Sequence, residues 1–336
     1  MKPIQMMVIG VGGWGQNWIS SLLGNQEYKI VALVDEMAGR AEANCAKYGL
    51  ATAGAFRSIE DAIQQCQPEA AVITVPPAAH YNIAMKCMEA GLHILSEKPL
   101  ANDLDEAYSL LNMAAKQNIT FMVSQDYRFQ PPVRTLHDLI AEGRIGDPGY
   151  ISYRHYKRFK LGGWREEMEQ VILEDMAIHH FDLLRYLLGK ECLSVYSDTF
   201  NPKWSWYRSG AVANVQLVFE DDIHVEYLGT WVTSGWDDET TTGEIRIEGS
   251  LGSALLHTNG TLQIWEEGTS KEVPLQTMVS TGRAYSLQEF LIAVRQGLTA
   301  ETDIKDNINS YIITRAAIKA NDEKRRVNIS ELRKAV

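Results

Sequence analysis

Six residues near the N-terminus, Gly10-Val-Gly-Gly-Trp-Gly15, constrain this chain more than any other stretch. They follow an apolar run at 4–9 that predicts a short buried strand, and they precede residues 16–23, which predict a helix. Twenty residues after the glycines, a second apolar run at 29–34 ends in Asp35. Strand, glycine turn, helix, strand and acid in this order predict a dinucleotide-binding βαβ unit, although a glycine-rich turn of another α/β protein would also fit the glycines alone.

Each part of the motif has a physical task. Gly10 permits the tight turn out of the strand, Gly12 lets the backbone approach a pyrophosphate, and Gly15 lets the helix pack closely on the strand. The helix N-terminus offers unpaired N–H groups to the phosphates. Asp35 would accept hydrogen bonds from the adenosine ribose and repel a 2′-phosphate, so NAD is favoured over NADP. Arg40 is placed where it could turn towards such a phosphate and weaken that preference.

The composition limits the function classes. The chain has 336 residues, which suits two domains, and a net charge of −11, which argues against nucleic acid or an anionic membrane as partner. No segment has the unbroken apolar length of a membrane span, and the N-terminus enters a strand without the pattern of a signal peptide. The four cysteines lack metal-ligand spacing and disulfide density, so a cytoplasmic location is expected.

The pattern of the chain changes once, near residue 125. Residues 1–124 alternate strands and helices, which predicts a doubly wound parallel sheet, the Rossmann arrangement. Residues 125–336 are rich in β-branched and aromatic runs with a hairpin signal at Asn259-Gly260, which predicts an α+β domain with a large open, mostly antiparallel sheet. One face of that sheet could line a polar cleft or cover a subunit interface, so a homo-oligomer, dimer or tetramer, is expected. The last helix of the chain could pack back on the first domain.

Polar residues follow two strands of the first domain. The run at 70–75 is ended by Pro76-Pro77, and ligands of such sheets bind beyond the carboxyl ends of the strands. His80 follows, as a functional residue or as an ordinary histidine of a helix start. Glu97 and Lys98 end the next strand, where a nicotinamide would lie, or they are solvated charges. The candidate cofactor contacts are Gly10, Gly12, Gly13, Trp14, Gly15, Asp35, Thr74, Pro76, His80, Glu97 and Lys98.

A helix is predicted at 172–188, ended by Gly189. Asp175, His179 and Asp182 share one face of it, while His180 points elsewhere. An acid one turn from a histidine can hold the ring as a general base requires. The alternatives are a polar stripe that faces water and a metal site, for which no further ligands support the spacing.

Three residues upstream of this helix are candidate substrate contacts. Trp164 could stack on a sugar ring, and Arg165 and Lys157 could bind substrate oxygens. A core or interface tryptophan and two solvated charges are the competing interpretations.

Together these motifs resemble the glucose–fructose oxidoreductase/inositol dehydrogenase (Gfo/Idh/MocA) family. The resemblance runs in order over nearly the whole chain, through Gly10-x-Gly12-x-x-Gly15, Asp35, Pro76-Pro77 with His80, Glu97-Lys98-Pro99, Tyr127-Arg128-Phe129, Gly143-Arg-Ile-Gly146 and Asp175-x-x-x-His179-x-x-Asp182. It implies that Lys98, Asp175 and His179 are catalytic, and that a secondary hydroxyl of a sugar, polyol or inositol is oxidised, or the product reduced. Residues 169–174 lack the glycines that many members carry before the catalytic aspartate, so the substrate pocket is expected to differ.

The resemblance leaves other functions open. The same scaffold supports an NAD-dependent glycosidase that oxidises its sugar transiently, and reductases of non-sugar carbonyls or double bonds. A non-catalytic sensor of NAD or sugar is a third possibility, against which the retention of Lys98, Asp175 and His179 argues.

Overall fold

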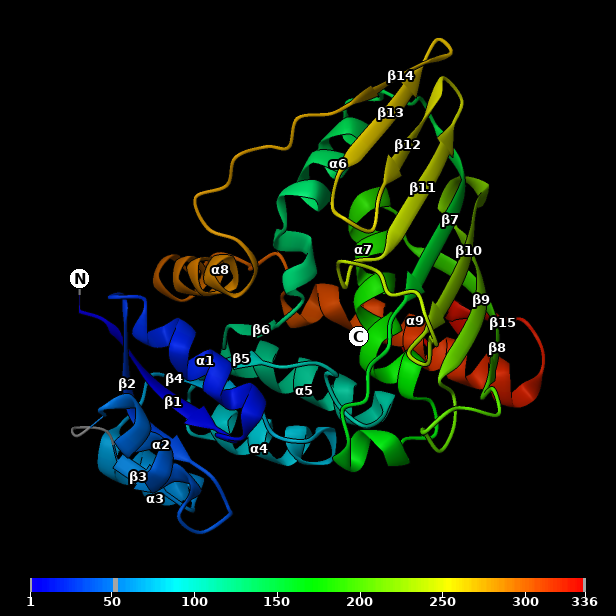
Figure 1. Ribbon diagram of the computed structural model, residues 1–336. Helices are drawn as coiled ribbons and strands as arrows, with labels where there is room; N and C mark the ends of the chain where they lie inside the picture. The colour runs from blue at the N-terminus through cyan, green and yellow to red at the C-terminus, as the bar shows by residue number, and fades with distance from the viewer. Residues whose placement is uncertain (1, 51–53, 335–336) are drawn as a thin grey trace. The chain divides into compact units, whose positions relative to one another are not determined.

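The computed structural model describes residues 2–50 and 54–334, which form two compact units (Figure 1). The first contains residues up to Asp126 together with Ser280–Ile308, and the second contains Tyr127–Val279 and the residues from Asn309 onward. The sequence assigned all of 125–336 to the second domain, so the placement of Ser280–Ile308 is a correction. Its cause is packing within the first unit, where the Tyr28 hydroxyl donates to the carbonyl of Leu287 over 2.5 Å.

The first unit is built on a parallel sheet that, among the described residues, has six strands in the order β3-β2-β1-β4-β5-β6. This is the predicted doubly wound Rossmann arrangement. Its core strands β1, β4 and β5 are almost wholly buried, as expected of a sheet covered on both faces. The strands are β1 (Ile4–Ile9), β2 (Tyr28–Val34), β3 (Gly54–Phe56), β4 (Ala70–Ile73), β5 (His93–Ser96) and β6 (Phe121–Val123).

The helices of this unit begin at local signals that the sequence carries. Ser58 caps α3 by accepting a hydrogen bond from the amide of Asp61 over 3.2 Å. Asp103 caps α5 in the same way through the amide of Glu106 at 2.9 Å. The helices are α1 (Gly13–Leu23), α2 (Arg40–Tyr48), α3 (Ile59–Cys66), α4 (Pro77–Glu89), α5 (Leu104–Gln117) and α8 (Gly282–Gln296), which packs against α1.

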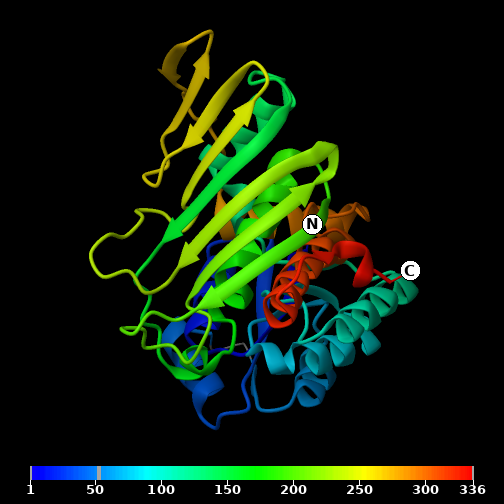
Figure 2. The ribbon, with the colours of Figure 1, turned by 90° about the vertical axis from the view of Figure 1, so that its right-hand side faces the viewer.

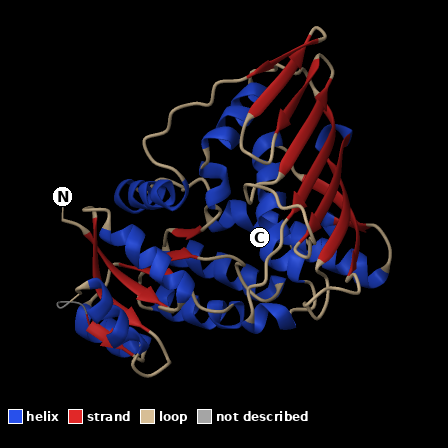
Figure 3. Cartoon of the chain, viewed as in Figure 1, coloured by secondary structure: helices blue, strands red, loops and turns tan. Residues whose placement is uncertain are grey.

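The second unit is strand-rich (Figure 3) and contains a sheet whose nine described strands have the order β14-β13-β12-β11-β7-β10-β9-β8-β15. Its described neighbours pair antiparallel except for β7 and β10, which confirms the predicted mostly antiparallel sheet. The strands are β7 (Pro148–Tyr156), β8 (Cys192–Phe200), β9 (Val212–Phe219), β10 (Ile223–Thr230), β11 (Glu244–Gly249), β12 (Gly252–Leu256), β13 (Leu262–Glu266), β14 (Thr269–Glu272) and β15 (Val327–Asn328).

The two faces of this sheet differ. Helices α6 (Pro131–Ala141) and α7 (Ile178–Leu188) lie on one face, and Figure 2 shows the other face without a covering helix among the described residues. Strand β10 alternates accordingly, with Val225 and Tyr227 buried and His224 and Glu226 exposed. Helix α9 (Ile304–Glu323) begins in the first unit and continues into the second.

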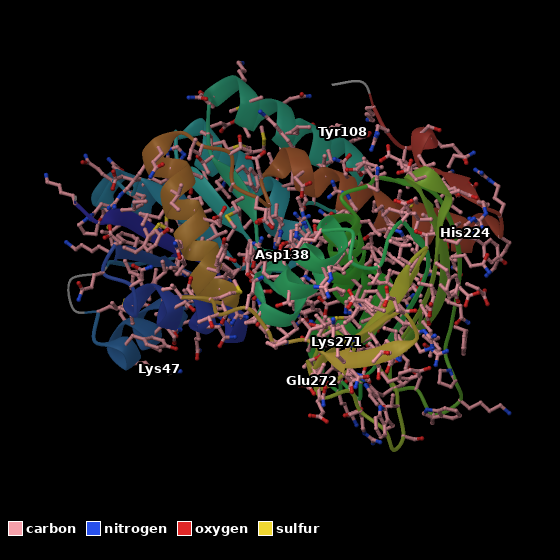
Figure 4. The ribbon with its side chains drawn as sticks, turned by 90° about the horizontal axis from the view of Figure 1, so that it is seen from above. Lys47, Tyr108, Asp138, His224, Lys271 and Glu272 are labelled. Atoms are coloured by element: carbon pink, nitrogen blue, oxygen red, sulfur yellow. The ribbon has the colours of Figure 1, made fainter. Side chains whose placement is uncertain are left out.

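The exposed edge of the sheet is strand β14, whose residues all face solvent. Lys271 and Glu272 project from it (Figure 4), and such charges discourage an edge strand from pairing with another chain.

None of the described helices combines the length and the apolar character needed to cross a membrane.

Candidate active site

The glycine turn of the first unit has the shape of a phosphate-binding loop. Gly10 has a φ of +84°, and a Cβ on Gly15 would lie 2.1 Å from the carbonyl oxygen of Gly10, so the helix could not pack as it does with a larger residue. Above the loop there is room: a Cβ on Gly12 would meet only Arg40 Nη1, at 4.0 Å, and one on Gly13 would meet nothing within 4 Å. A dinucleotide pyrophosphate fits this open backbone, at the start of α1.

Asp35 is fixed at the end of β2. Its carboxylate accepts hydrogen bonds from the amides of Val11 and Met37, both at 3.0 Å. Arg40 Nη1 lies 3.4 Å from both carboxylate oxygens, and its side chain is partly exposed. The acid is therefore held in place beside the glycine turn, and Arg40, a cation that could compensate a 2′-phosphate, is paired with it.

A tryptophan pair joins the glycine turn to the end of β5. Trp18 Nε1 donates to Glu97 Oε1 over 2.7 Å, and Trp14, which is 49 % exposed, lies under the guanidinium of Arg283 at 4.8 Å from its ring centre. Burial and then the nearby charge of Asp126 raise the pKa of Glu97. The sequence did not single out Trp18 or Arg283. Trp18 lies one helical turn after Trp14, so helical spacing could have pointed to it. Arg283 lies far along the chain, and no sequence pattern connects it with the glycine turn.

His80 connects two strand ends. One ring nitrogen lies 2.7 Å from the carbonyl of Pro99 and the other 2.9 Å from that of Val75, while burial lowers its pKa. A neutral imidazole has one N–H, so one of these contacts is the donated hydrogen bond. Both nitrogens are occupied by backbone, so the structure supports a positioning role for His80. It steadies the segments that carry Thr74, Pro76 and half-buried Lys98.

The second unit holds the other candidate catalytic residues. Ile172–Ala177 forms a π-helical turn that runs directly into α7, and such turns are frequent at functional sites. Asp175 on the turn and His179 on the helix are each only 7 % exposed. The ring of Tyr127 stacks on that of His179, with centroids 4.5 Å apart. The interpretation of this helix face as a stripe that faces water is therefore wrong.

Arg165 binds the candidate catalytic acid directly. Its Nε donates to Asp175 Oδ2 over 2.7 Å, and its guanidinium lies 4.4 Å from the ring centre of Trp164. The simple solvated-charge interpretation of Arg165 is wrong. Lys157, the third predicted substrate contact, donates from Nζ to the carbonyl of Asp238.

Asp182, on the predicted catalytic face, has a different role. Both of its carboxylate oxygens accept from Arg128, through Nε and Nη2 at 2.6 Å each, and Ser310 Oγ donates to one of them at 2.7 Å. Asp182 is 1 % exposed. The bidentate ion pair with Arg128 is buried and has Ser310 as a third partner, so Asp182 anchors α7 as part of a structural network.

Breaking this network should destabilise the second unit. Asp182→Ala leaves the Arg128 guanidinium buried without its carboxylate, so we expect the free energy of unfolding to fall by about 3–5 kcal/mol. Glu323→Ala, which removes surface ion pairs with Lys319 and Arg325, should cost far less. Urea unfolding followed by circular dichroism measures both, and equal losses would contradict the assignment.

His180 is likewise structural. Its ring nitrogens lie 3.0 Å from the Tyr227 hydroxyl and 3.0 Å from the carbonyl of Thr241, and burial lowers its pKa to about 4. Of the paired histidines, His179 therefore remains the candidate base. Within residues 2–50 and 54–334, no cluster of His, Cys, Asp and Glu has the arrangement of a metal site.

Known proteins with the same organisation identify the family. Residues 4–125 match the oxidoreductase family with an NAD-binding Rossmann fold, and residues 133–255 match the Gfo/Idh/MocA C-terminal domain. The chain belongs to the Gfo/Idh/MocA oxidoreductase family. It is an enzyme of the NAD(P)-dependent dehydrogenase type that acts on CH–OH groups, as the motifs implied.

Several relatives of this family member match it over nine tenths of its length or more. It is 27 % identical to the scyllo-inositol 2-dehydrogenase (NAD⁺) of Bacillus subtilis, with 91 % of each chain covered. It is 24 % identical to the inositol 2-dehydrogenase of Rhizobium meliloti, covering 97 % of this chain and 99 % of that one. An oxidoreductase of Agrobacterium radiobacter, solved with NAD⁺, L-tartaric acid and magnesium, has the same fold, with a TM-score of 0.89, 18 % identity and coverage of 98 % and 99 %.

Proposed function

We propose that this oxidoreductase uses NAD to oxidise a secondary hydroxyl of a sugar, polyol or inositol, or reduces the corresponding carbonyl. The observation that carries the proposal is the burial of Asp175 on a π-helical turn and of His179 on the helix that follows it, in a chain whose Rossmann unit holds Asp35 beside an open glycine loop. The named activities of the inositol dehydrogenase relatives support the substrate class.

In the proposed mechanism His179 is the general base and accepts the hydroxyl proton. Asp175 orients it, and stacking on Tyr127 restricts the tilt of its ring. Lys98 hydrogen-bonds the same substrate oxygen and stabilises its developing negative charge. Bound NAD supplies the acceptor for the hydride that leaves the carbon, so one C–H and one O–H bond are broken as the C=O bond forms.

Absorbance of reduced nicotinamide tests the proposal. Purified enzyme is mixed with NAD, and separately with NADP, across a panel of sugars, polyols and inositols. A rise with NAD and one substrate class is the expected result. Net hydrolysis of a chromogenic glycoside without accumulation of NADH would instead establish the transient-oxidation glycosidase, and cofactor binding with neither reaction would establish a sensor.

Asp35 should control the choice of cofactor. Asp35→Ser removes both the ribose hydrogen bond and the charge that repels a 2′-phosphate, and it frees Arg40 from its ion pair. We expect the ratio of kcat/KM for NAD over NADP to fall by about 10- to 100-fold, the value of a hydrogen bond to a charged group. Initial rates with both cofactors measure it.

The neighbouring acid provides the matched control. Glu36 is exposed, and Arg57 contacts its backbone carbonyl. Glu36→Ser should therefore change the cofactor ratio by no more than about threefold, because an exposed charge is screened by salt. An equal shift in both variants would mean that only general charge acts on the cofactor.

Association into a dimer or tetramer and a cytoplasmic location remain predictions. Sedimentation would measure the first.

A further inference from the structure

The guanidinium of Arg165 has capacity that the protein does not use. Arginine carries five N–H donors in a planar fork, and here Nε is engaged with Asp175 Oδ2 at 2.7 Å. In the described part of the chain, no acceptor takes a hydrogen bond from Nη1 or Nη2 of Arg165, and its side chain is 30 % exposed. The outer edge of the guanidinium, formed by Nη1 and Nη2, is therefore accessible, while Nε is anchored on Asp175, the proposed catalytic acid.

Two contacts hold the guanidinium of Arg165 in place. The ring of Trp164 lies against the guanidinium at 4.4 Å, and the ion pair fixes its rotation. A planar cation held on two sides loses little conformational entropy when it binds a further planar anion, and carboxylates match its outer edge with two parallel hydrogen bonds.

The surrounding segment is strongly basic. Residues 154–165 contain five cations and no acid, in a chain whose net charge is −11. Of the acids that follow it, Glu169 pairs with Arg208 at 2.7 Å and Glu174 with Arg315 at 3.4 Å, and Glu166 accepts from the amide of Gly162 at 3.2 Å. Lys157 contacts a carbonyl rather than a carboxylate, so its charge is not neutralised by an ion pair.

Aromatic side chains lie beside the cation. Tyr207 and Trp206 both donate to the carbonyl of Phe159, at 2.6 and 3.0 Å. The amide of Arg208 donates to the carbonyl of Glu166 over 2.8 Å, so Tyr207 lies on a segment that runs alongside that of Arg165. A fixed aromatic surface next to a guanidinium suits a carbon skeleton that ends in an acid.

We propose that the substrate carries a carboxylate in addition to its secondary hydroxyl, and that Arg165 is a specificity residue that bridges this carboxylate and Asp175. The substrate class is then a polyhydroxy acid, an aldonate or a uronate, rather than a neutral sugar or inositol. This inference rests on the proposed function, since it names the substrate of the same site.

Matched substrate pairs test it. D-glucuronate is compared with D-glucose and D-gluconate with sorbitol, each with saturating NAD, and the reverse reaction is assayed with NADH. We expect the better acid to exceed its neutral partner by about 10- to 100-fold in kcat/KM. In Arg165→Gln that ratio should fall to near 1, and Arg165→Lys should keep part of it, because lysine retains the charge without the fork.

Arg158→Gln is the control variant. Arg158 lies on the same segment, is exposed, and also stacks on a tryptophan, Trp206, at 5.4 Å, but it has no carboxylate partner among the described residues. Its acid-to-neutral ratio should match that of the unmodified enzyme. If Arg165→Gln lowers kcat/KM equally for acid and neutral substrates, Arg165 only positions Asp175, and the inference is wrong.

Calorimetry separates failure of the inference from failure of the proposed function. Binding of D-gluconate and D-glucuronate to the NAD-loaded enzyme, lost in Arg165→Gln, supports the acid site even where no hydride transfer is observed. Turnover of neutral polyols without binding or turnover of either acid overturns the inference and leaves the proposed function intact. Absence of both acid binding and all turnover overturns both.

Discussion

Replacing Lys98 by methionine should lower kcat about 100- to 1,000-fold while the Kd for NAD changes only a few fold. The ammonium group acts where negative charge develops on the substrate oxygen, which happens in the transition state and not in the bound cofactor. Methionine keeps much of the side-chain length but donates no hydrogen bond. Steady-state kinetics gives kcat, and quenching of the protein's tryptophan fluorescence, to which exposed Trp14 in the glycine turn contributes, gives the Kd.

Lys116→Met is the control for this experiment. Lys116 is an exposed residue of the last turn of α5, so its replacement should leave both quantities unchanged. Loss of NAD affinity in Lys98→Met as large as its loss of kcat would assign Lys98 to cofactor binding, and unchanged turnover would remove it from the mechanism.

Much of the first unit follows from local sequence. The buried strand β1 begins and ends at the predicted residues, and Ser58 caps α3, because apolar runs and capping side chains act over a few residues. The glycine turn and Asp35 are equally readable, since the spacing itself encodes the geometry. What the sequence misplaced is Ser280–Ile308, whose membership of the first unit depends on contacts with distant residues such as Tyr28.

The site was predictable in its residue types and not in its partners. Asp175, Asp182 and His179 stand out by helical spacing, but nothing near them indicates that Asp182 binds Arg128 and Ser310, 54 and 128 positions away. A regular helix was also expected where a π-helical turn occurs. Such a widening depends on the packing of the turn against strands β9 and β10, so the periodicity of the sequence does not reveal it.

The second large effect concerns the base. His179→Asn should lower kcat/KM about 100- to 10,000-fold, because proton removal from the hydroxyl loses its acceptor. In the unmodified enzyme activity should fall as the pH decreases, since a protonated imidazole cannot accept a proton. That acidic limb should be absent from the residual activity of His179→Asn. The pH dependence of kcat/KM measures both, with the melting temperature of the variant as the check that it is folded.

The neighbouring histidine distinguishes a lost base from a damaged helix. His180→Asn removes a ring of the same size from the adjacent position, where it contacts Tyr227 and the carbonyl of Thr241. Burial holds the pKa of His180 near 4, so it stays neutral across the assay range and contributes no limb to the profile. We therefore expect His180→Asn to lower stability and to keep the acidic limb. If the acidic limb is absent in His180→Asn and present in His179→Asn, the base has been assigned to the wrong histidine. The role of Asp175 as the acid that orients His179 would then also be wrong.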